Sequence, residues 1–219
     1  MNKAAKVFVV DDHPLVSEWL GNLLQQQAHL VFCGEAKSAG TALAAIAKAG
    51  ADVAIVDLSL KDGSGLDLIR KLKVEQPQVS SIVLSMYDER VYGERTIRAG
   101  AMGYIMKQET AKSVVAAIRC VLSGKLYLSE SALARLDDRP APRNIRGQLL
   151  PTDNLSNREL EVFEALGRGM GTRQVSIDFD LSIKTVHSYC DRIKEKLHFA
   201  SGAELIRAAI ERNVRSNGD

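Results

Sequence analysis

The stretch Val53-Ala54-Ile55-Val56-Asp57 joins four consecutive apolar residues to a single carboxylate. A second apolar run lies at residues 7–10, directly before two acids. Continuous runs of this kind are typical of strands covered on both faces, because a half-exposed strand would alternate polar and apolar residues. We therefore expect a parallel sheet with helices on both sides.

Outward from these two runs, short β-rich segments alternate with amphipathic helical windows. The predicted strands span residues 6–10, 30–34, 53–57, 81–85 and 103–106, and the predicted helices span residues 14–27, 38–49, 64–75, 88–99 and 111–123. Strict alternation of strand and helix gives right-handed βαβ units. Residues 1–124 are thus predicted to form an α/β domain with a flavodoxin-like, doubly wound, five-stranded parallel sheet.

The pattern changes after residue 124. The segment 137–142 combines charged residues with two prolines, so residues 125–154 are interpreted as a linker that can hold one short helix over 129–136. Residues 155–219 are predicted to form a small all-α domain. Ser156 followed by Glu159 is the pattern of a capping box, with Leu155 and Leu160 at the positions of a hydrophobic staple.

Four helices are predicted in this all-α segment. They cover residues 156–168, 172–179, 183–197 and 202–212, with Thr172 and Ser182 as side-chain caps of the second and third and a tight turn at 180–182. A helix, a short helix, a turn and a longer helix make the plan of a helix-turn-helix.

Composition limits the class of protein. No stretch approaches the roughly 18 to 20 apolar residues of a membrane span, and the N-terminus does not have the pattern of a signal peptide. Cys33, Cys120 and Cys190 lie far apart in the sequence, which favours free thiols in a reducing compartment. We expect a cytoplasmic protein that does not contact the membrane.

The charge of the all-α segment is balanced. Residues 151–219 carry 10 Lys and Arg against 11 Asp and Glu, within a chain of net charge +2. Because phosphate contacts supply most of the affinity of non-specific DNA binding, this balance argues against strong non-specific binding.

Polar residues follow the predicted strands at their carboxyl ends, where functional groups of a parallel sheet gather. Asp11 and Asp12 follow the first strand, Asp57 ends the third, Ser85 ends the fourth, and Lys107 follows the fifth. Three carboxylates repel one another unless a cation lies among them, and a hard divalent ion such as Mg²⁺ takes oxygen ligands. Taken singly, each residue would be interpreted as a turn, a cap or a solvated charge. Together they predict a phosphoryl site with Asp57 as nucleophile, Lys107 as a fixed positive charge and the Ser85 hydroxyl as a donor.

Four linked motifs over residues 5–124 resemble the receiver domains of response regulators. They are Val9-Val10-Asp11-Asp12-His13-Pro14, the segment from Val56-Asp57 to Gly65, Leu84-Ser85-Met86, and Gly103-Tyr104-Ile105-Met106-Lys107. The sequence departs from the family at Lys61, where proline is common, and at Ser85, where threonine is commoner.

The resemblance implies the CheY-like form of this doubly wound fold and also implies roles for these residues. Asp11, Asp12, Asp57 and the backbone carbonyl of Ser59 would hold Mg²⁺, and Asp57 would accept a phosphoryl group from a sensor histidine kinase. Ser85 and Tyr104 would form a switch pair, with the hydroxyl moving toward the phosphoryl group as the aromatic ring turns inward.

Two motifs in the all-α segment resemble the LuxR-type helix-turn-helix of the NarL/FixJ class of regulators. They are Leu155-Ser156-Asn157-Arg158-Glu159-Leu160-Glu161-Val162, and Lys184-Thr185-Val186 followed by Ile193 and Lys196-Leu197. The match covers residues 155–213 and implies binding to double-stranded DNA, with a homodimer forming on phosphorylation and reading two half-sites about 34 Å apart.

The helix predicted over 183–197 would then present one face to the major groove. Its apolar stripe, which includes Val186 and Ile193, is interpreted as core. The residues expected to approach base edges are His187, Ser188 and Asp191, and those expected to contact the DNA backbone are Lys184, Arg192, Lys194 and Arg173, with Thr185 in the matched motif. Asp191 can accept from a cytosine amino group but repels phosphate.

Two other functions compete with phosphorylation-controlled transcription regulation. The C-terminal helices could act by protein contact with weak or no DNA binding, which Asp191 and the even charge balance favour. The strand-end Asp57 would also suit an aspartate-nucleophile phosphohydrolase. However, Ser59 stands two residues later, where such an enzyme would need a second acid, so we expect a phosphoryl acceptor and not a turnover enzyme.

Overall fold

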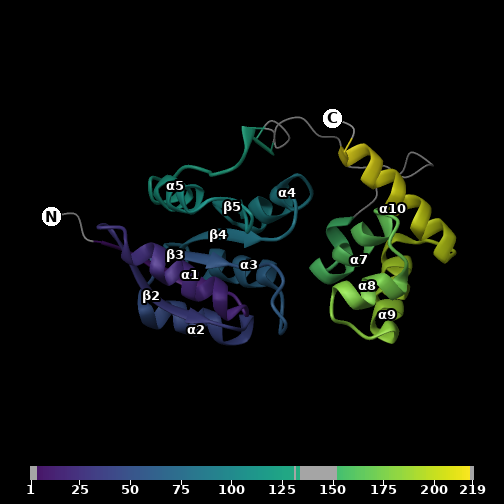
Figure 1. Cartoon of the computed structure of the whole chain (residues 1–219), viewed down its shortest axis with the longest axis horizontal. Helices are drawn as coiled ribbons and strands as arrows, with labels where there is room; N and C mark the ends of the chain where they lie inside the picture. Colours follow the sequence, from purple (N-terminus) through teal and green to yellow (C-terminus); the bar gives the residue numbers. More distant parts are fainter. Residues whose placement is uncertain (1–3, 131, 134–151, 218–219) are drawn as a thin grey trace. The chain divides into compact units, whose positions relative to one another are not determined.

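The computed structural model describes residues 4–130, 132–133 and 152–217 (Figure 1). The chain divides into two compact units, Met1–Asp138 and Arg139–Asp219, which we describe one at a time. The predicted domain boundaries at residues 124 and 154 stay predictions.

The N-terminal unit is a five-stranded, fully parallel sheet with strand order β2-β1-β3-β4-β5. Its strands are β1 (Ala5–Val10), β2 (Leu30–Ala36), β3 (Val53–Val56), β4 (Ser80–Ser85) and β5 (Gly103–Met106). Its helices are α1 (Pro14–Gln25), α2 (Ala39–Ala49), α3 (Gly65–Glu75), α4 (Glu89–Ala99) and α5 (Ala111–Leu122). The doubly wound α/β fold is confirmed, and the predicted elements differ from these only by a few residues at their ends.

Helices cover the sheet because its strands are apolar on both faces. Val9, Ile55 and Ile105 of the sheet share one core with Leu20 of α1 and Ile118 of α5. Helix α3 packs between α2 and α4, which the right-handed crossovers place on the opposite face. All four residues of β3 are buried, as a strand covered on both sides requires.

The carboxyl edge of this sheet is built tightly around the end of β3. Asp57 follows β3 directly, and its backbone N–H donates to the Val10 carbonyl of β1 over 2.8 Å. A Cβ atom at Gly65 would lie 2.0 Å from the backbone oxygen of Asp57. Helix α3 can therefore begin against the strand end only because residue 65 has no side chain.

The C-terminal unit is helical, with a short 3₁₀ helix at Thr152–Asn154, α7 (Asn157–Gly167), α8 (Thr172–Asp178), α9 (Ile183–Leu197) and α10 (Gly202–Asn217). The capping box is confirmed: the Ser156 hydroxyl accepts from Glu159 N, and a Glu159 carboxylate oxygen accepts from Ser156 N over 2.6 Å. Ser182 caps α9 as predicted, accepting from Thr185 N over 3.0 Å.

Two details of the C-terminal unit correct the sequence-based expectation. Thr172 does not cap α8, because Gly171 occupies the N-cap position and α8 has no side-chain cap. The last helix runs to Asn217 and not to residue 212, since the sequence holds no glycine or proline between 203 and 217 to stop it.

Half of the linker helix predicted over 129–136 lies outside the described residues. Within the described half, residues 130, 132 and 133 are helical. None of the helices in the described part of the chain is long and apolar enough to cross a membrane.

Candidate metal centre and nucleic-acid interface

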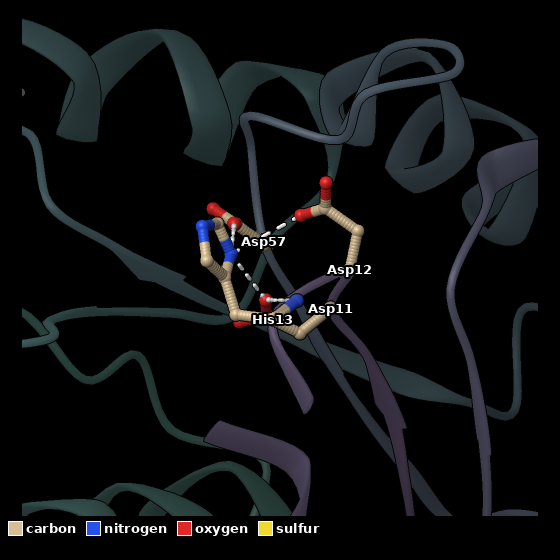
Figure 2. Close-up of side chains that lie close together, drawn as sticks. All are labelled: Asp11, Asp12, His13 and Asp57. Carbon is tan, nitrogen blue, oxygen red and sulfur yellow. Dashed lines mark hydrogen bonds and ion pairs between the residues drawn. The ribbon is translucent and has the colours of Figure 1, made fainter. Parts of the chain in front are cut away.

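The predicted carboxylates come together at the carboxyl edge of the sheet. Asp11, Asp12 and Asp57 each offer an oxygen, and His13 offers a nitrogen, with all four atoms within 4.8 Å of one another (Figure 2). Asp11 and Asp57 are each only 2 % exposed. The cluster arises because β1 and β3 are neighbours in the sheet and their ends lie side by side.

The side chain of Asp12 is 6 % exposed, yet neither of its oxygens accepts a hydrogen bond from the described residues. His13 Nδ1 lies 3.1 Å from Asp12 Oδ1, and Lys61 Nζ lies 4.0 Å from Asp12 Oδ2. A buried carboxylate without hydrogen bonds is costly. A divalent cation among these oxygens would compensate the charge, so the donor set fits a hard ion such as Mg²⁺.

Lys107 supplies a fixed positive charge beside two of the acids. Its Nζ lies 2.7 Å from Asp11 Oδ2 and donates to Asp57 Oδ2 over 2.8 Å. Burial alone would lower the pKa of Lys107, but the charges of Asp57 and Asp11 and their hydrogen bonds raise it. The lysine therefore stays protonated, and the site holds an ammonium group within reach of whatever Asp57 carries.

Asp57 has the chemistry of a buried nucleophile. Burial raises the pKa of Asp57, with Lys107 opposing that rise and Asp11 adding to it. Its Oδ1 accepts from the backbone N–H of Ser59 over 3.2 Å, which places the predicted metal-ligating residue against the same carboxylate.

The predicted switch residues lie in the interior next to this site. Ser85 is fully buried, and its hydroxyl accepts from Tyr87 N over 3.2 Å. Tyr104 is 1 % exposed, and its hydroxyl donates to the Tyr87 carbonyl over 3.0 Å. Burial raises the pKa of Tyr104 well above its ordinary value. The ring of Tyr104 is thus turned inward in this structure, and the switching role of the pair stays a prediction.

Two residues gain a place in the site that sequence reasoning did not give them. His13 stands in the quoted motif, and its Nδ1 lies 2.9 Å from Asp11 Oδ1. Lys61, noted only as a departure from the family pattern, lies close to Asp12. The proximity of His13 to two adjacent acids was a usable signal, whereas the position of Lys61 depends on loop geometry that the sequence does not display.

Helix α9 presents most of the predicted DNA-contacting residues on its surface. Lys184, His187, Ser188, Asp191 and Arg192 are exposed. Thr185 and Lys194 are partly buried, and Arg173 is exposed on α8. On the opposite side, Val186 and Ile193 are fully buried, so the interpretation of that stripe as core is confirmed.

Two contacts shape the exposed face of α9. Lys194 Nζ lies 2.9 Å from Asp191 Oδ1, so the acid on this face carries its own counter-charge. The Arg192 guanidinium lies 5.9 Å from the centre of the Tyr189 ring. A shallow pocket of ≈ 330 Å³ beside them is lined by Ser182, Lys184, Thr185, Ser188, Tyr189 and Arg192. None of these side chains is a carboxylate, which suits contact with phosphate oxygens.

Part of the negative charge of the C-terminal unit lies in its interior. Three glutamates of α7, Glu159, Glu161 and Glu164, are 2 %, 1 % and 5 % exposed. They pair with Lys196 over 2.6 Å, Arg158 over 2.8 Å and Arg212 over 2.6 Å, respectively. These acids are therefore internal, and they do not add negative charge to the face of α9.

Comparison with known proteins agrees with both units. Residues 7–119 match the model of the response regulator receiver domain, and residues 153–209 match that of the bacterial regulatory proteins of the luxR family. The chain is 32 % identical over 205 residues to the transcriptional activator protein ExaE of Pseudomonas putida, covering 94 % of this chain and 95 % of the relative. It is 30 % identical over 213 residues to the response regulator UvrY of Escherichia coli, covering 95 % and 94 %.

A solved structure of the RcsB response regulator from Salmonella typhimurium is also similar. It is 27 % identical with a TM-score of 0.56, covering 94 % of this chain and 98 % of that one. The chain therefore belongs to the response regulators with a LuxR-type output domain, a class of phosphorylation-controlled DNA-binding regulators.

Proposed function

We propose that Asp57 accepts a phosphoryl group from a sensor histidine kinase and that this event controls DNA binding by the C-terminal unit. The observation that carries the proposal is the set of contacts around Asp57. The buried carboxylate of Asp57 shares Lys107 with Asp11, and one of its oxygens lies within 4.8 Å of an oxygen of Asp12, which accepts no hydrogen bond from the described residues.

The transfer is a substitution at phosphorus. A carboxylate oxygen of Asp57 forms the new P–O bond as the P–N bond to the kinase histidine breaks, and the imidazole nitrogen leaves with the electron pair of that bond. The product is an aspartyl-phosphate, an acyl phosphate that hydrolyses to restore Asp57. The chain acts as a phosphoryl acceptor in this scheme, and no second acid stands two residues after Asp57 to support rapid turnover.

Asp11, Asp12, Asp57 and the carbonyl of Ser59 would hold Mg²⁺, which supplies charge neutralisation for phosphoryl oxygens when it is bound. Lys107 supplies the same kind of stabilisation from the protein. Its ammonium group is already placed by two carboxylates, so little reorganisation is needed when negative charge develops on the phosphoryl oxygens. Ser85 is the last residue of β4 and is fully buried, and its hydroxyl is the donor we assign to a phosphoryl oxygen.

The C-terminal unit would bind double-stranded DNA through α9. His187, Ser188 and Asp191 would approach base edges, and Lys184 and Arg192 would contact phosphates. Lys194, which pairs with Asp191, would contribute less to phosphate binding than its charge suggests. We propose that phosphorylation favours a homodimer, which would bind two half-sites about 34 Å apart.

Intact-mass spectrometry after treatment with acetyl phosphate and Mg²⁺ tests the chemistry of Asp57. The wild type should gain the mass of one phosphoryl group, and Asp57→Asn should gain none. Asp62→Asn is a matched control, because Asp62 is an exposed acid in the following loop. A phosphoryl gain by Asp57→Asn equal to that of the wild type would reject Asp57 as the acceptor.

A further inference from the structure

Two lysines lie near the carboxylates, and they differ in what they contact. Lys107 is 9 % exposed and lies against Asp11 and Asp57. Lys61 is 79 % exposed, and its Nζ lies 4.0 Å from Asp12 Oδ2. The oxygens of Asp12 accept no hydrogen bond from the described residues. Lys61 thus adds a second, water-exposed positive charge at the carboxylate that Lys107 does not contact.

The loop after β3 holds Lys61 in this position. Leu58 and Leu60 are each 2 % exposed and anchor the loop in the core. Gly65 allows α3 to begin against the backbone of Asp57. Residue 61 follows a buried anchor, so its backbone is fixed near the site although its side chain extends into water. An ammonium group on such a flexible side chain acts chiefly through its charge.

The net charge of the site depends on whether Lys61 is counted, both with a metal ion alone and with a metal ion and a phosphoryl group. Three carboxylates and Lys107 leave two net negative charges, which one divalent ion neutralises. Adding the charge of Lys61 makes the metal-bound site net positive. Converting the Asp57 carboxylate into a phosphoryl dianion adds one negative charge, so the metal-bound, phosphorylated site becomes neutral only when Lys61 is counted.

We infer that Lys61 biases the site against the metal ion alone and toward the metal ion together with a phosphoryl group. This inference rests on the proposed function and adds a determinant to it. It predicts that removing the charge of Lys61 moves two equilibria in opposite directions. A loss of loop structure would instead weaken both.

The experiment uses the full chain at one fixed pH and low ionic strength. His13, the fourth member of the cluster, is then under the same conditions in every variant. Mg²⁺ is titrated calorimetrically into wild type, Lys61→Gln and Lys61→Arg. Beryllofluoride, a mimic of the phosphoryl group, is then titrated at saturating Mg²⁺. Lys61→Gln should bind Mg²⁺ about three- to tenfold more tightly than wild type and beryllofluoride more weakly by a similar factor, with both differences shrinking at high salt. Lys61→Arg should resemble wild type.

Lys48→Gln is a matched control, because Lys48 is exposed in the last turn of α2. The carbonyl of the next residue, Ala49, accepts a hydrogen bond from Lys6 near the amino end of β1. Lys48 therefore lies at the end of the strands away from the carboxylates. Equal affinities of wild type and Lys61→Gln for both probes, or shifts in the same direction, would overturn the inference while leaving the metal site intact. Failure of the wild type to bind Mg²⁺ would overturn the proposed metal site and this inference together. Asp12→Asn should abolish Mg²⁺ binding and identifies the signal as coming from this site.

Discussion

Among the described residues, each unit holds a set of three carboxylates with little exposure to water, and the two sets differ in how their charges are compensated. In the C-terminal unit, each of the three buried glutamates of α7 has a basic partner at 2.6 to 2.8 Å. In the receiver unit, Asp11 and Asp57 share the single ammonium of Lys107, and Asp12 accepts no hydrogen bond from the described residues. The charge of each glutamate is therefore compensated by its partner, whereas the charges of the three aspartates are compensated only in part.

The glutamates of α7 are compensated by ion pairs within the fold. The aspartates at the sheet edge are left available to bind a metal ion and a phosphoryl group. A paired and hydrogen-bonded carboxylate contributes little net stability, but removing its partner is costly. A cluster in which three carboxylates have too few close cationic partners is under electrostatic strain, which a metal ion or a protonation event would relieve. Removing one acid should therefore destabilise the C-terminal unit less than removing its partner does, and should stabilise the receiver unit.

The largest expected effect is on the α7–α10 contact. Arg212→Ala leaves Glu164 buried without a counter-charge and removes the hydrogen bond from Arg212 to Thr152 Oγ1. We expect a loss of about 3 kcal/mol in the stability of the C-terminal unit. Hydrogen–deuterium exchange of α7 peptides in the full chain measures it. Adding Glu164→Gln to this variant should restore much of the protection, and a double variant as unstable as Arg212→Ala would argue that the lost packing, not the charge, is responsible.

In the receiver unit, by contrast, removing one acid is expected to increase the stability. Asp12→Asn removes a charge from the unneutralised cluster and should stabilise the metal-free unit by about 1 to 3 kcal/mol. Trp19 in α1 is the only tryptophan in the chain, so its fluorescence reports on urea unfolding of this unit. The same variant should no longer be stabilised by added Mg²⁺. Destabilisation by Asp12→Asn would mean that the carboxylate is already satisfied in the folded protein.

The smallest effect is the pH dependence that Glu159 contributes to the stability of the C-terminal unit. Burial alone would raise the pKa of Glu159, but the hydrogen bonds from Lys196 and Ser156 lower it below its ordinary value of 4.5. Because the pKa is lower in the folded state, this contribution to stability is fully present above pH 4.5 and is lost as the pH falls through the folded pKa. The protection factors of α7 amides, which correct for the slower intrinsic exchange of amides in acid, should fall over that range.

Lys196→Gln provides the comparison for this pH effect. It removes the charged partner of Glu159, so the acid-induced loss of protection in α7 should be smaller than in wild type. An acid response that is identical in the two proteins would assign the effect to other carboxylates.

The order of elements in the receiver unit and the acids at the edge of its sheet could be predicted from the sequence. Apolar runs ending in acids predict parallel strands, and the topology then requires Asp11 and Asp57 to meet at one edge. Ser156 and Ser182 were recognised as caps because their partners lie a fixed three residues away. Thr172 was assigned wrongly because a glycine before it satisfies the backbone geometry of an N-cap equally well.

The features that could not be predicted depend on tertiary placement of side chains. Charge counts gave an even C-terminal segment, but they do not show that Glu159, Glu161 and Glu164 are internal. Likewise, a count of basic residues does not reveal that Lys194 pairs with Asp191. This pairing should weaken the phosphate contact expected of Lys194.

The central claim is that modification of Asp57 controls DNA reading by α9. The most direct measurement is selection from a random duplex DNA library by the full chain treated with acetyl phosphate and Mg²⁺, with Asp57→Asn treated in parallel. We predict that the wild type enriches a defined motif with two-fold symmetry and that Asp57→Asn enriches it much more weakly. Enrichment by neither protein, with Asp57 of the wild type shown to be phosphorylated, would contradict DNA reading. Equal enrichment by both would contradict its control by Asp57.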